Sequence, residues 1–386
     1  MKKGLRQGFT TGSAATAAAM AALTRLLLGE TPDACEIPLP VPGRLRVPVE
    51  AVSLPDADGA VTASVIKDAG DDPDVTHGAR IACRVRFAPA QTPPSADAAE
   101  GPRQVVIDGG QGVGRVTLPG LPIPPGQAAI NPGPRRQIRA AILEILERAE
   151  RAGAIIPPGA VFVLVEMENG AELAKKTMNP RLGVVGGASI LGETGIVIPY
   201  SLASWEASIS EGMDVAKAMG IRRLVLTTGR RSERFHQARR PDLPAQAFVQ
   251  IADFFAFSLA QAARREFAEL TLACFFGKLV KMAMGMDYTH AQSGEIDFAG
   301  LADWARQAGL PEDAARDVAR ANTARHVLEI ARGAPGSEAF LARTARQALA
   351  AARRFAGPGP GLRVALYDFE GGPLLELAAP DQASSP

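Results

Sequence analysis

A short acidic turn carries the side chains best suited to proton chemistry. Residues 67–78 hold four aspartates and one of the four histidines in the chain. Crowded carboxylates raise one another's pKa, which suits general acid–base catalysis or cation binding, although the register of a calcium loop is absent. A solvated loop closed by Asx turns is the alternative interpretation. The candidate catalytic residues, which we expect to face the active cleft, are Asp68, Asp71, Asp72 and His77.

A glycine-rich segment at residues 169–195 is the second place where a ligand could be held. Glycines leave backbone N–H groups accessible and let a ligand approach the chain closely. Basic side chains in the same segment can pair with carboxylates. Those candidates are Lys175, Lys176 and Arg181. A set of tight turns at a domain junction is the alternative interpretation.

Two further segments are predicted at one edge of a parallel sheet. Thr227-Thr228-Gly229 ends a strand, and residues 277–281 open a helix directly after another strand. Open α/β sheets bind ligands at the carboxyl ends of their strands. The helix dipole adds there to the charges of Lys278 and Lys281, which attracts an anion. His290 lies just past this helix. Lysines that merely reach water are the alternative.

Residues 109–114 have the glycine spacing of a dinucleotide-binding loop after a short strand. The segment that follows, residues 115–119, is extended and ends in proline. A phosphate site needs the N-terminus of a helix at that point. We therefore predict a tight β-hairpin in place of a nucleotide site.

Apolar periodicity and the positions of glycine and proline predict the elements that position these segments. The first helix is expected to begin at a Thr11 or Ser13 N-cap and to end at Gly29. Residues 91–103, rich in Pro, Ala and Asp, are predicted to form a surface loop. The predicted helices cover residues 14–28, 134–152, 203–218, 278–286 and 297–356, with a further helix that begins at 247 or 251 and ends at 267. The predicted strands cover 45–52, 61–67, 81–87, 104–107, 161–166, 223–227 and 270–275, and a strand at 247–251 is the alternative to the earlier helix start.

The pattern changes at Gly195, from strands broken by loops to strands that alternate with helices, which predicts parallel βαβ units. We expect an α+β domain with glycine-rich loops over residues 1–195 and an α/β domain with a parallel sheet over 196–310. Residues 311–386 are expected to form a helical segment and a terminal β-hairpin around Gly371-Gly372. One option is that this hairpin packs against the first domain.

Composition excludes several functional classes. Lys and Arg total 42 against 41 Asp and Glu, so no overall field draws the protein to nucleic acid or to an anionic membrane. Three cysteines without a CxxC pair argue against a disulfide framework and a structural zinc site, and they fit a reducing cytoplasm. The Ala-rich N-terminal run resembles a signal peptide, but Arg25 interrupts an apolar stretch already too short to span a bilayer.

Taken in order, these segments resemble the motifs of the cobalt-precorrin-5B C1-methyltransferase family. The segments at 67–77 and 169–195 are long and specific, and the resemblance spans about residues 6–309. The matching segments are residues 6–19, 67–78, 110–121, 129–132, 169–201, 227–229 and 277–285 with Thr289-His290. The resemblance implies an α+β domain followed by a Rossmann-like domain, and a step of anaerobic cobalamin biosynthesis.

The resemblance also implies S-adenosylmethionine as cofactor and a cobalt-containing tetrapyrrole with acetate and propionate arms as substrate. The cobalt belongs to the substrate, so no protein-bound metal is expected. The candidate cofactor-binding residues are Gly186, Gly187, Gly192, Thr194, Thr227, Thr228 and Gly229. The candidate substrate-binding residues are Lys175, Lys176, Arg181, Lys278, Lys281 and His290.

The implied reaction is attack by an electron-rich ring carbon on the sulfonium methyl. Alignment of two bound reactants contributes roughly 7–11 kcal/mol, so an acid–base residue is optional. Methylation of a related tetrapyrrole at another position and a non-catalytic corrinoid carrier are the rival functions, and a homo-oligomer stays open. This chain departs from the family pattern at Ala15, at Glu193, at Ala291 and at Cys274-Phe275-Phe276-Gly277, which replaces Gly-His-Ile-Gly.

Overall fold

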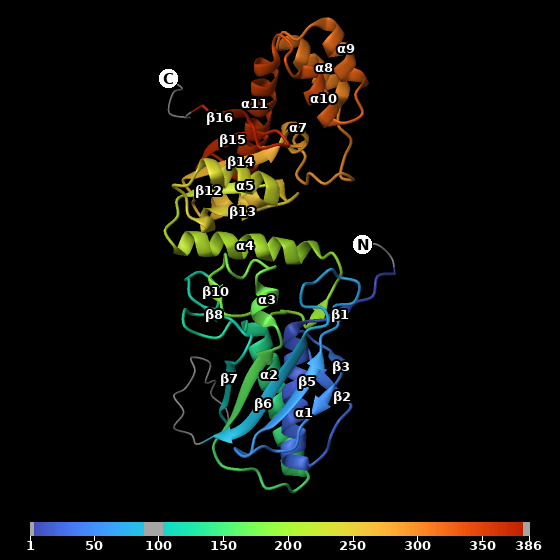
Figure 1. Ribbon diagram of the computed structural model, residues 1–386, viewed down its shortest axis with the longest axis vertical. Coiled ribbons are helices and arrows are strands. Elements are labelled where there is room, and N and C mark those ends of the chain that lie inside the picture. The colour runs from blue at the N-terminus through green and yellow to red at the C-terminus, as the bar shows by residue number, and fades with distance from the viewer. Residues whose placement is uncertain (1–3, 89–102, 381–386) are drawn as a thin grey trace. The chain divides into compact units, whose positions relative to one another are not determined.

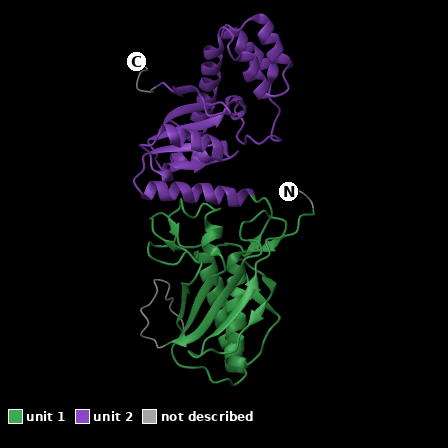
Figure 2. Ribbon diagram, viewed as in Figure 1, with its two compact units in different colours: residues 1–201 green, residues 202–386 purple. Residues whose placement is uncertain are grey.

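The computed structural model describes residues 4–88 and 103–380. The chain has an α/β fold with mixed sheets and forms two compact units, residues 1–201 and 202–386 (Figure 2). The unit boundary follows Ser201, six residues beyond the junction that we placed at Gly195. The predicted surface loop at 91–103 lies outside the described residues except for Arg103.

Two helices form the core of unit 1 behind its main sheet (Figure 1). α1 (Thr11–Leu28) is rich in buried alanine and packs against α2 (Pro132–Arg151), with the sheet on its other side. Its N-cap is Thr10, whose hydroxyl accepts the N–H of Ser13, so the caps predicted at Thr11 and Ser13 were wrong. Gly29 ends it in the left-handed conformation, as predicted. Among the residues that the structure describes, α1 is the one helix long and apolar enough to cross a membrane, so the expectation that this stretch is too short was wrong. Burial covers 72% of the helix, as in the core helix of a folded domain.

The main sheet of unit 1 has the strand order β4-β5-β6-β9-β7, antiparallel except for the parallel pair β7–β9. One face of the sheet is buried, and it packs on α1 through the alternate residues of β5 and β6. The predicted strand at 45–52 divides into β3 and β4, and β2 was missed, although Cys35 and Ile37 alternate with exposed residues as in a half-buried strand. The strands are β2 (Ala34–Pro38), β3 (Arg44–Pro48), β4 (Ala51–Val52), β5 (Val61–Ile66), β6 (Arg80–Ala88), β7 (Val105–Gly109) and β9 (Ala160–Met167).

Short elements complete unit 1. The segment after the glycines of residues 109–114 is extended, as predicted, but the β-hairpin is wrong, because β8 (Arg115–Val116) pairs with β10 (Val184–Val185) while β7 pairs with β9. α3 (Gly170–Ala174) opens the long glycine-rich segment. β1 (Gly8–Phe9) pairs with β11 (Ile196–Val197), so the first and the last segments of unit 1 lie side by side.

The sheet of unit 2 has the order β13-β12-β14-β15-β16, in which β12 to β15 are parallel and β16 is antiparallel. The predicted return of the C-terminal hairpin to the first domain is wrong. β15 buries Leu362, Val364 and Leu366 beside β14, and this apolar strand completes the sheet of unit 2. The strands are β12 (Arg223–Thr227), β13 (Phe248–Gln250), β14 (Glu269–Phe275), β15 (Gly361–Tyr367) and β16 (Pro373–Ala378).

Helices cover the two faces of this sheet unequally. A large apolar core forms with α4, α6 to α8 and α11, while α5 closes a smaller cluster around Phe248 and Tyr367. α5 was missed because its sequence is mostly charged, with four arginines in ten residues. The helices are α4 (Leu202–Ala218), α5 (Arg230–Arg239), the 3-10 turn η1 (Ala245–Ala247), α6 (Phe255–Arg264), α7 (Phe276–Ala283), α8 (Phe298–Gln307), α9 (Glu312–Arg320), α10 (Ala324–Ala331) and α11 (Ser337–Ala356).

Candidate functional site

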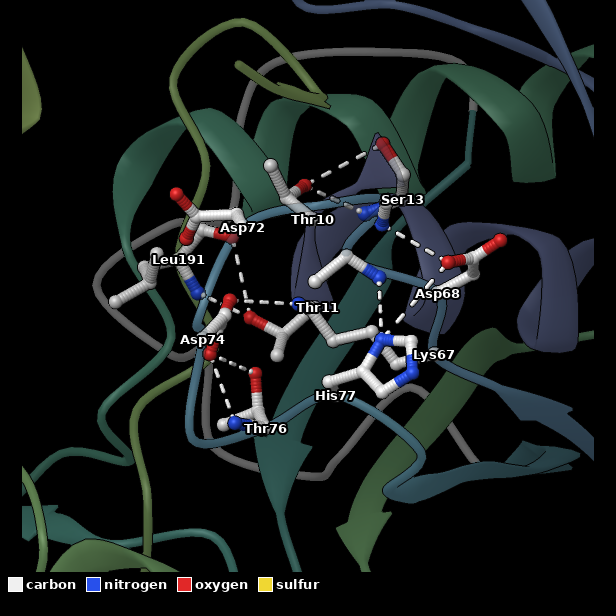
Figure 3. A network of polar contacts seen from close by, with 12 residues as sticks. Thr10, Thr11, Ser13, Lys67, Asp68, Asp72, Asp74, Thr76, His77 and Leu191 are labelled. Carbon is white, nitrogen blue, oxygen red and sulfur yellow. Dashed lines mark hydrogen bonds and ion pairs between the residues drawn. The ribbon is translucent and has the colours of Figure 1, made fainter. Parts of the chain in front are cut away.

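Three segments that are far apart in the sequence meet in unit 1 (Figure 3). Phe9 donates its backbone N–H to the carbonyl of Asp68 at 2.8 Å, and Tyr200 donates its own to Oδ1 of Asp72 at 2.9 Å. Figure 3 shows Leu191 in the same network, bonded to the start of α1. The structure therefore brings together segments that carry the family motifs, namely residues 6–13, 67–77 and 191–200.

Arg6 organises the first part of the acidic turn. Its guanidinium pairs with the carboxylate of Asp68, and its backbone N–H donates to Oδ2 of Asp71 at 2.7 Å. The backbone N–H of Gly70 donates to Oδ1 of Asp68 at 2.9 Å. Hydrogen bonding by Arg6 lowers the pKa of Asp68, so the expectation that crowding raises the pKa is wrong here. Asp68 is an ionised hydrogen-bond acceptor at neutral pH.

His77 lies beside Asp68, and its side chain is largely exposed. Its Nδ1 accepts the backbone N–H of Ala69 at 3.1 Å and lies 3.8 Å from Oδ1 of Asp68. In the neutral ring the proton is therefore on Nε2. The side chain is 53% exposed. The imidazole of His77 is thus accessible to a ligand, and it lies beside the carboxylate of Asp68.

A buried ion pair that sequence reasoning missed anchors the second part of the turn. Nζ of Lys67 lies 2.7 Å from Oδ2 of Asp74, and the Lys67 side chain is only 1% exposed. The other carboxylate oxygen accepts both the N–H and the hydroxyl of Thr76. Burial opposes the ionisation of Asp74, but Lys67 and Thr76 together outweigh it and lower its pKa. No spacing rule signals this pair, because a strand end and a turn bring the two residues together.

Most glycines of the long segment serve close backbone packing. A Cβ on Gly187 would lie 2.3 Å from the carbonyl oxygen of Gly112, and one on Gly170 would lie 2.0 Å from the same atom. A Cβ on Gly192 would meet the Thr10 side chain at 2.3 Å. Gly186 differs, because its Cβ position is open. The loops of residues 109–114 and 169–195 are therefore interlocked, and Gly186 is the point where a ligand can approach the backbone.

This difference gives a test on two adjacent residues. Gly187→Ala is expected to destabilise unit 1 strongly, because the methyl group would overlap backbone atoms that cannot move apart cheaply. Gly186→Ala has a positive φ of 84° but open space, so we expect a cost of about 1 kcal/mol. Urea unfolding of both variants checks this order, and equal midpoints would contradict it.

The remaining candidates of unit 1 lie on its surface. Lys175 pairs with Glu172 at 2.6 Å, with both side chains more than half exposed, and Lys176 is also exposed. Arg181 is partly buried. The hydroxyl of Thr194 accepts the N–H of Ile196 at 3.4 Å. The exposed side chains of Lys175 and Lys176 are accessible for binding.

In unit 2, Thr227-Thr228-Gly229 lies where the strand order changes direction, between β12 and β14. Thr227 is buried and its hydroxyl donates to the carboxylate of Glu233 at 3.2 Å. Thr228 donates its N–H to the carbonyl of Ala273, which ties the ends of β12 and β14 together. Gly229 caps α5, and its Cβ position is open. Ligands of open α/β sheets bind at such a point.

Lys278 and Lys281 are already engaged within unit 2. Lys278 pairs with Asp253 and donates to the carbonyl of Thr289 at 3.1 Å. Burial, together with the charge of Lys281, lowers the pKa of Lys278 to about 8. Lys281 is 8% exposed and donates to the carbonyl of His290 at 2.6 Å. The lysines therefore hold the loop at residues 289–290 and do not merely reach water.

His290 itself is exposed, and its Nδ1 accepts the N–H of Gln292 at 3.2 Å. Asp253, which follows β13 at the same sheet edge, was missed because no local motif marks it. Within residues 4–88 and 103–380 there is no group of three His, Cys, Asp or Glu side chains that could hold a metal ion.

Comparison with known proteins places these observations in a family. Residues 1–199 match CbiD, and residues 288–376 match the CbiD C-terminal domain. The chain is 48% identical over 373 residues to a cobalt-precorrin-5B C(1)-methyltransferase of Nitratidesulfovibrio vulgaris, covering 95% of this chain and 91% of that protein. It is 43% identical over 382 residues to the protein of that name from a Geobacillus species, covering 99% of each.

A crystal structure of a cobalamin biosynthesis protein (cbiD) from Archaeoglobus fulgidus is 27% identical and covers 72% of this chain and 79% of that one, with a TM-score of 0.38. The family match covers more than half of the chain, and the relatives align over nearly its whole length. The protein therefore belongs to the CbiD family.

Proposed function

We propose that this chain transfers a methyl group from S-adenosylmethionine to C1 of cobalt-precorrin-5B, which gives cobalt-precorrin-6A in anaerobic cobalamin biosynthesis. Relatives of that name align with nearly the whole chain. The observation that carries the proposal is the convergence of three family motifs around Asp68 and His77 in unit 1. An electron pair on C1 forms the new C–C bond, while the pair of the S–CH3 bond stays on sulfur and neutralises the sulfonium.

Unit 2 is proposed to be the Rossmann-like domain that binds the methyl donor. Thr228 and Gly229 lie at the point where the strand order changes, and the open Cβ position of Gly229 fits close approach by a ligand. When bound, the donor supplies the methyl group and the leaving sulfur. In unit 1, Gly186 offers open backbone, whereas Gly187 and Gly192 are proposed to support that loop by packing.

The carboxylate arms of the substrate need basic partners. Lys175, Lys176 and Arg181 in unit 1 and His290 in unit 2 are proposed to provide them, since Lys175, Lys176 and His290 are exposed. Asp68, Asp71, Asp72 and His77 are proposed to place the reactants or to move a proton through Nε2 of His77. A cytoplasmic location is proposed because the three cysteines are free and buried.

The two lysines of α7 are proposed to differ in their roles. Lys278→Met is expected to weaken tetrapyrrole binding severalfold, and the wild-type affinity is expected to fall as the pH rises through about 8, where Lys278 loses its proton. Lys281→Met removes the donor to His290 and should lower stability more than affinity. Calorimetry between pH 6.5 and 9 and urea unfolding check both statements. If the variant that carries both Lys278→Met and Lys281→Met binds the tetrapyrrole with unchanged affinity, Lys278 is not part of the substrate site.

One anaerobic assay tests the function. The full chain is incubated with S-adenosylmethionine and cobalt-precorrin-5B, and S-adenosylhomocysteine and product mass are measured. Equimolar S-adenosylhomocysteine and a product that carries the new methyl on C1 are expected. A methyl group at another ring position would identify a different tetrapyrrole methylase. Binding of the tetrapyrrole without S-adenosylhomocysteine would identify a corrinoid carrier.

A further inference from the structure

Two phenylalanine rings are stacked at the carboxyl edge of the unit 2 sheet. Phe275 is the last residue of β14, and Phe369 follows the end of β15. Their ring centroids are 4.9 Å apart and their planes are inclined by only 17°. Phe369 keeps 37% of its surface exposed. The two rings therefore give the chain a flat apolar surface at an edge where ligands of open α/β sheets bind.

Two arginines from different helices lie over these rings. Cζ of Arg231, in the first turn of α5, is 5.7 Å from the centroid of Phe275 and 5.5 Å from that of Phe369. Cζ of Arg325, from α10, is 5.5 Å from the centroid of Phe369. Both side chains are exposed. The distances lie within the range of cation–π attraction, about 6 Å.

Stacking fixes a guanidinium without consuming its hydrogen-bond donors. Arg231 uses one N–H on the carbonyl of Phe369, and Arg325 uses Nε on the exposed carboxylate of Glu329 at 2.9 Å. Each guanidinium has five N–H donors, so donors are left for a ligand. An exposed pair such as Arg325–Glu329 is weak and yields easily to a better acceptor.

The buried acid next to Phe369 in the chain has other partners. Asp368 lies beside Phe369, but its Oδ1 accepts the N–H groups of Glu370 and Gly372, and its Oδ2 pairs with Arg332 at 3.2 Å. Its carboxylate is thus used to shape the turn that presents Phe369. The cluster combines a fixed aromatic surface with guanidinium groups whose strongest remaining interaction is with an added carboxylate.

We infer that Arg231, Arg325, Phe275 and Phe369 form a subsite that binds a carboxylate-bearing edge of the tetrapyrrole substrate. The guanidinium groups bind acetate or propionate arms, and the exposed ring of Phe369 contacts the conjugated macrocycle. This inference rests on the proposed function, because that function supplies a planar polyanionic substrate. The amino acid part of the methyl donor also carries a carboxylate, and the experiment separates the two sources.

The test compares two corrin probes by calorimetry with the full chain. Cobyrinic acid carries free carboxylates, whereas cobinamide carries amides at the corresponding arms. Arg231→Gln is expected to weaken the binding of cobyrinic acid roughly tenfold or more and to change that of cobinamide little. Arg325→Gln should act in the same direction, and Phe369→Leu should weaken both probes. Arg231→Lys, which keeps the charge but loses the stacked fork, should fall between wild type and Arg231→Gln.

Arg264→Gln is the matched control, because it also removes one exposed positive charge. Arg264 ends α6 and precedes the first residue of β14, so it lies toward the amino edge of the sheet, away from the proposed subsite. Its affinities should equal those of the wild type. Several results would overturn the subsite: wild type that does not bind cobyrinic acid, unchanged affinity in the Arg231→Gln/Arg325→Gln double variant, or equal losses for both probes in that variant. A selective loss of S-adenosylmethionine affinity would also overturn it and assign the cluster to the donor.

The binding experiment and the turnover assay test the subsite and the methyl transfer separately. If the wild type produces no S-adenosylhomocysteine but its affinity for cobyrinic acid depends on Arg231, the subsite stands and the proposed methyl transfer fails. If turnover is observed while the arginine variants bind both probes normally, the methyl transfer stands and the subsite fails.

Discussion

His77→Gln and Asp68→Asn are expected to lower kcat/KM on the order of 100-fold, the lower end of what a positioned acid–base group contributes. The His77 side chain is 53% exposed, and Asp68 is the carboxylate beside its ring. Asp71→Asn and Asp72→Asn should also reduce turnover. An asparagine oxygen can still accept the N–H groups of Arg6 and Tyr200, so these variants remove charge while the turn keeps its shape.

Stability should change much less than turnover in these variants. The Arg6–Asp68 pair is exposed, and pairs of that kind contribute about 0–1 kcal/mol. Asp33→Asn is the control, since its side chain is 94% exposed on the same unit. Initial rates of S-adenosylhomocysteine formation and urea midpoints provide the comparison. Near-normal rates in the three aspartate variants and in His77→Gln would show that the turn is only structural.

Breaking the Lys67–Asp74 pair is expected to have the largest effect on stability. Asp74→Asn leaves the ammonium of Lys67 almost fully buried without a counter-charge, and removal of one partner of a buried pair costs about 3–5 kcal/mol. Lys67→Met should cost less, because Asp74 keeps partial exposure and both donors of Thr76. The double variant should be more stable than the sum of the single changes predicts.

Urea unfolding of the full chain measures this cycle. Lys175→Met is the control, because it breaks a pair in which both side chains are largely exposed, and no measurable shift of the midpoint is expected. Additive effects of Lys67→Met and Asp74→Asn would contradict a coupled pair.

The same pair gives a dependence on pH with a defined sign. The pKa of Asp74 is lowered in the folded state, so its contribution to stability is fully present above the unfolded value of about 3.9. That contribution is lost as the pH falls through the lower folded value. Asp74→Asn should therefore lose less stability than the wild type between pH 5 and pH 2, and an unchanged acid-unfolding curve would argue against an ionised Asp74.

Local spacing determined a large part of this structure. The strand over residues 223–227 was predicted to the residue, and Gly29 was identified as the end of α1. Both features depend on neighbours along the chain: a short apolar run, and a residue without a Cβ where the left-handed conformation is needed. The sequence also predicted a ligand-binding role for the acidic turn and the glycine-rich segment, and that role stays a prediction.

Tertiary structure decided what those residues do. The sequence marks Asp68 as acidic, but only contact with Arg6, 62 residues earlier, lowers its pKa. It marks Gly187 as permissive, but only the carbonyl of Gly112 makes a side chain impossible there. The partners of Lys278 and the stack of Phe275 on Phe369 likewise come from other strands and loops. Pattern along the chain predicts much of the secondary structure, whereas protonation, burial and free donors depend on which distant atoms the topology brings within a few ångströms.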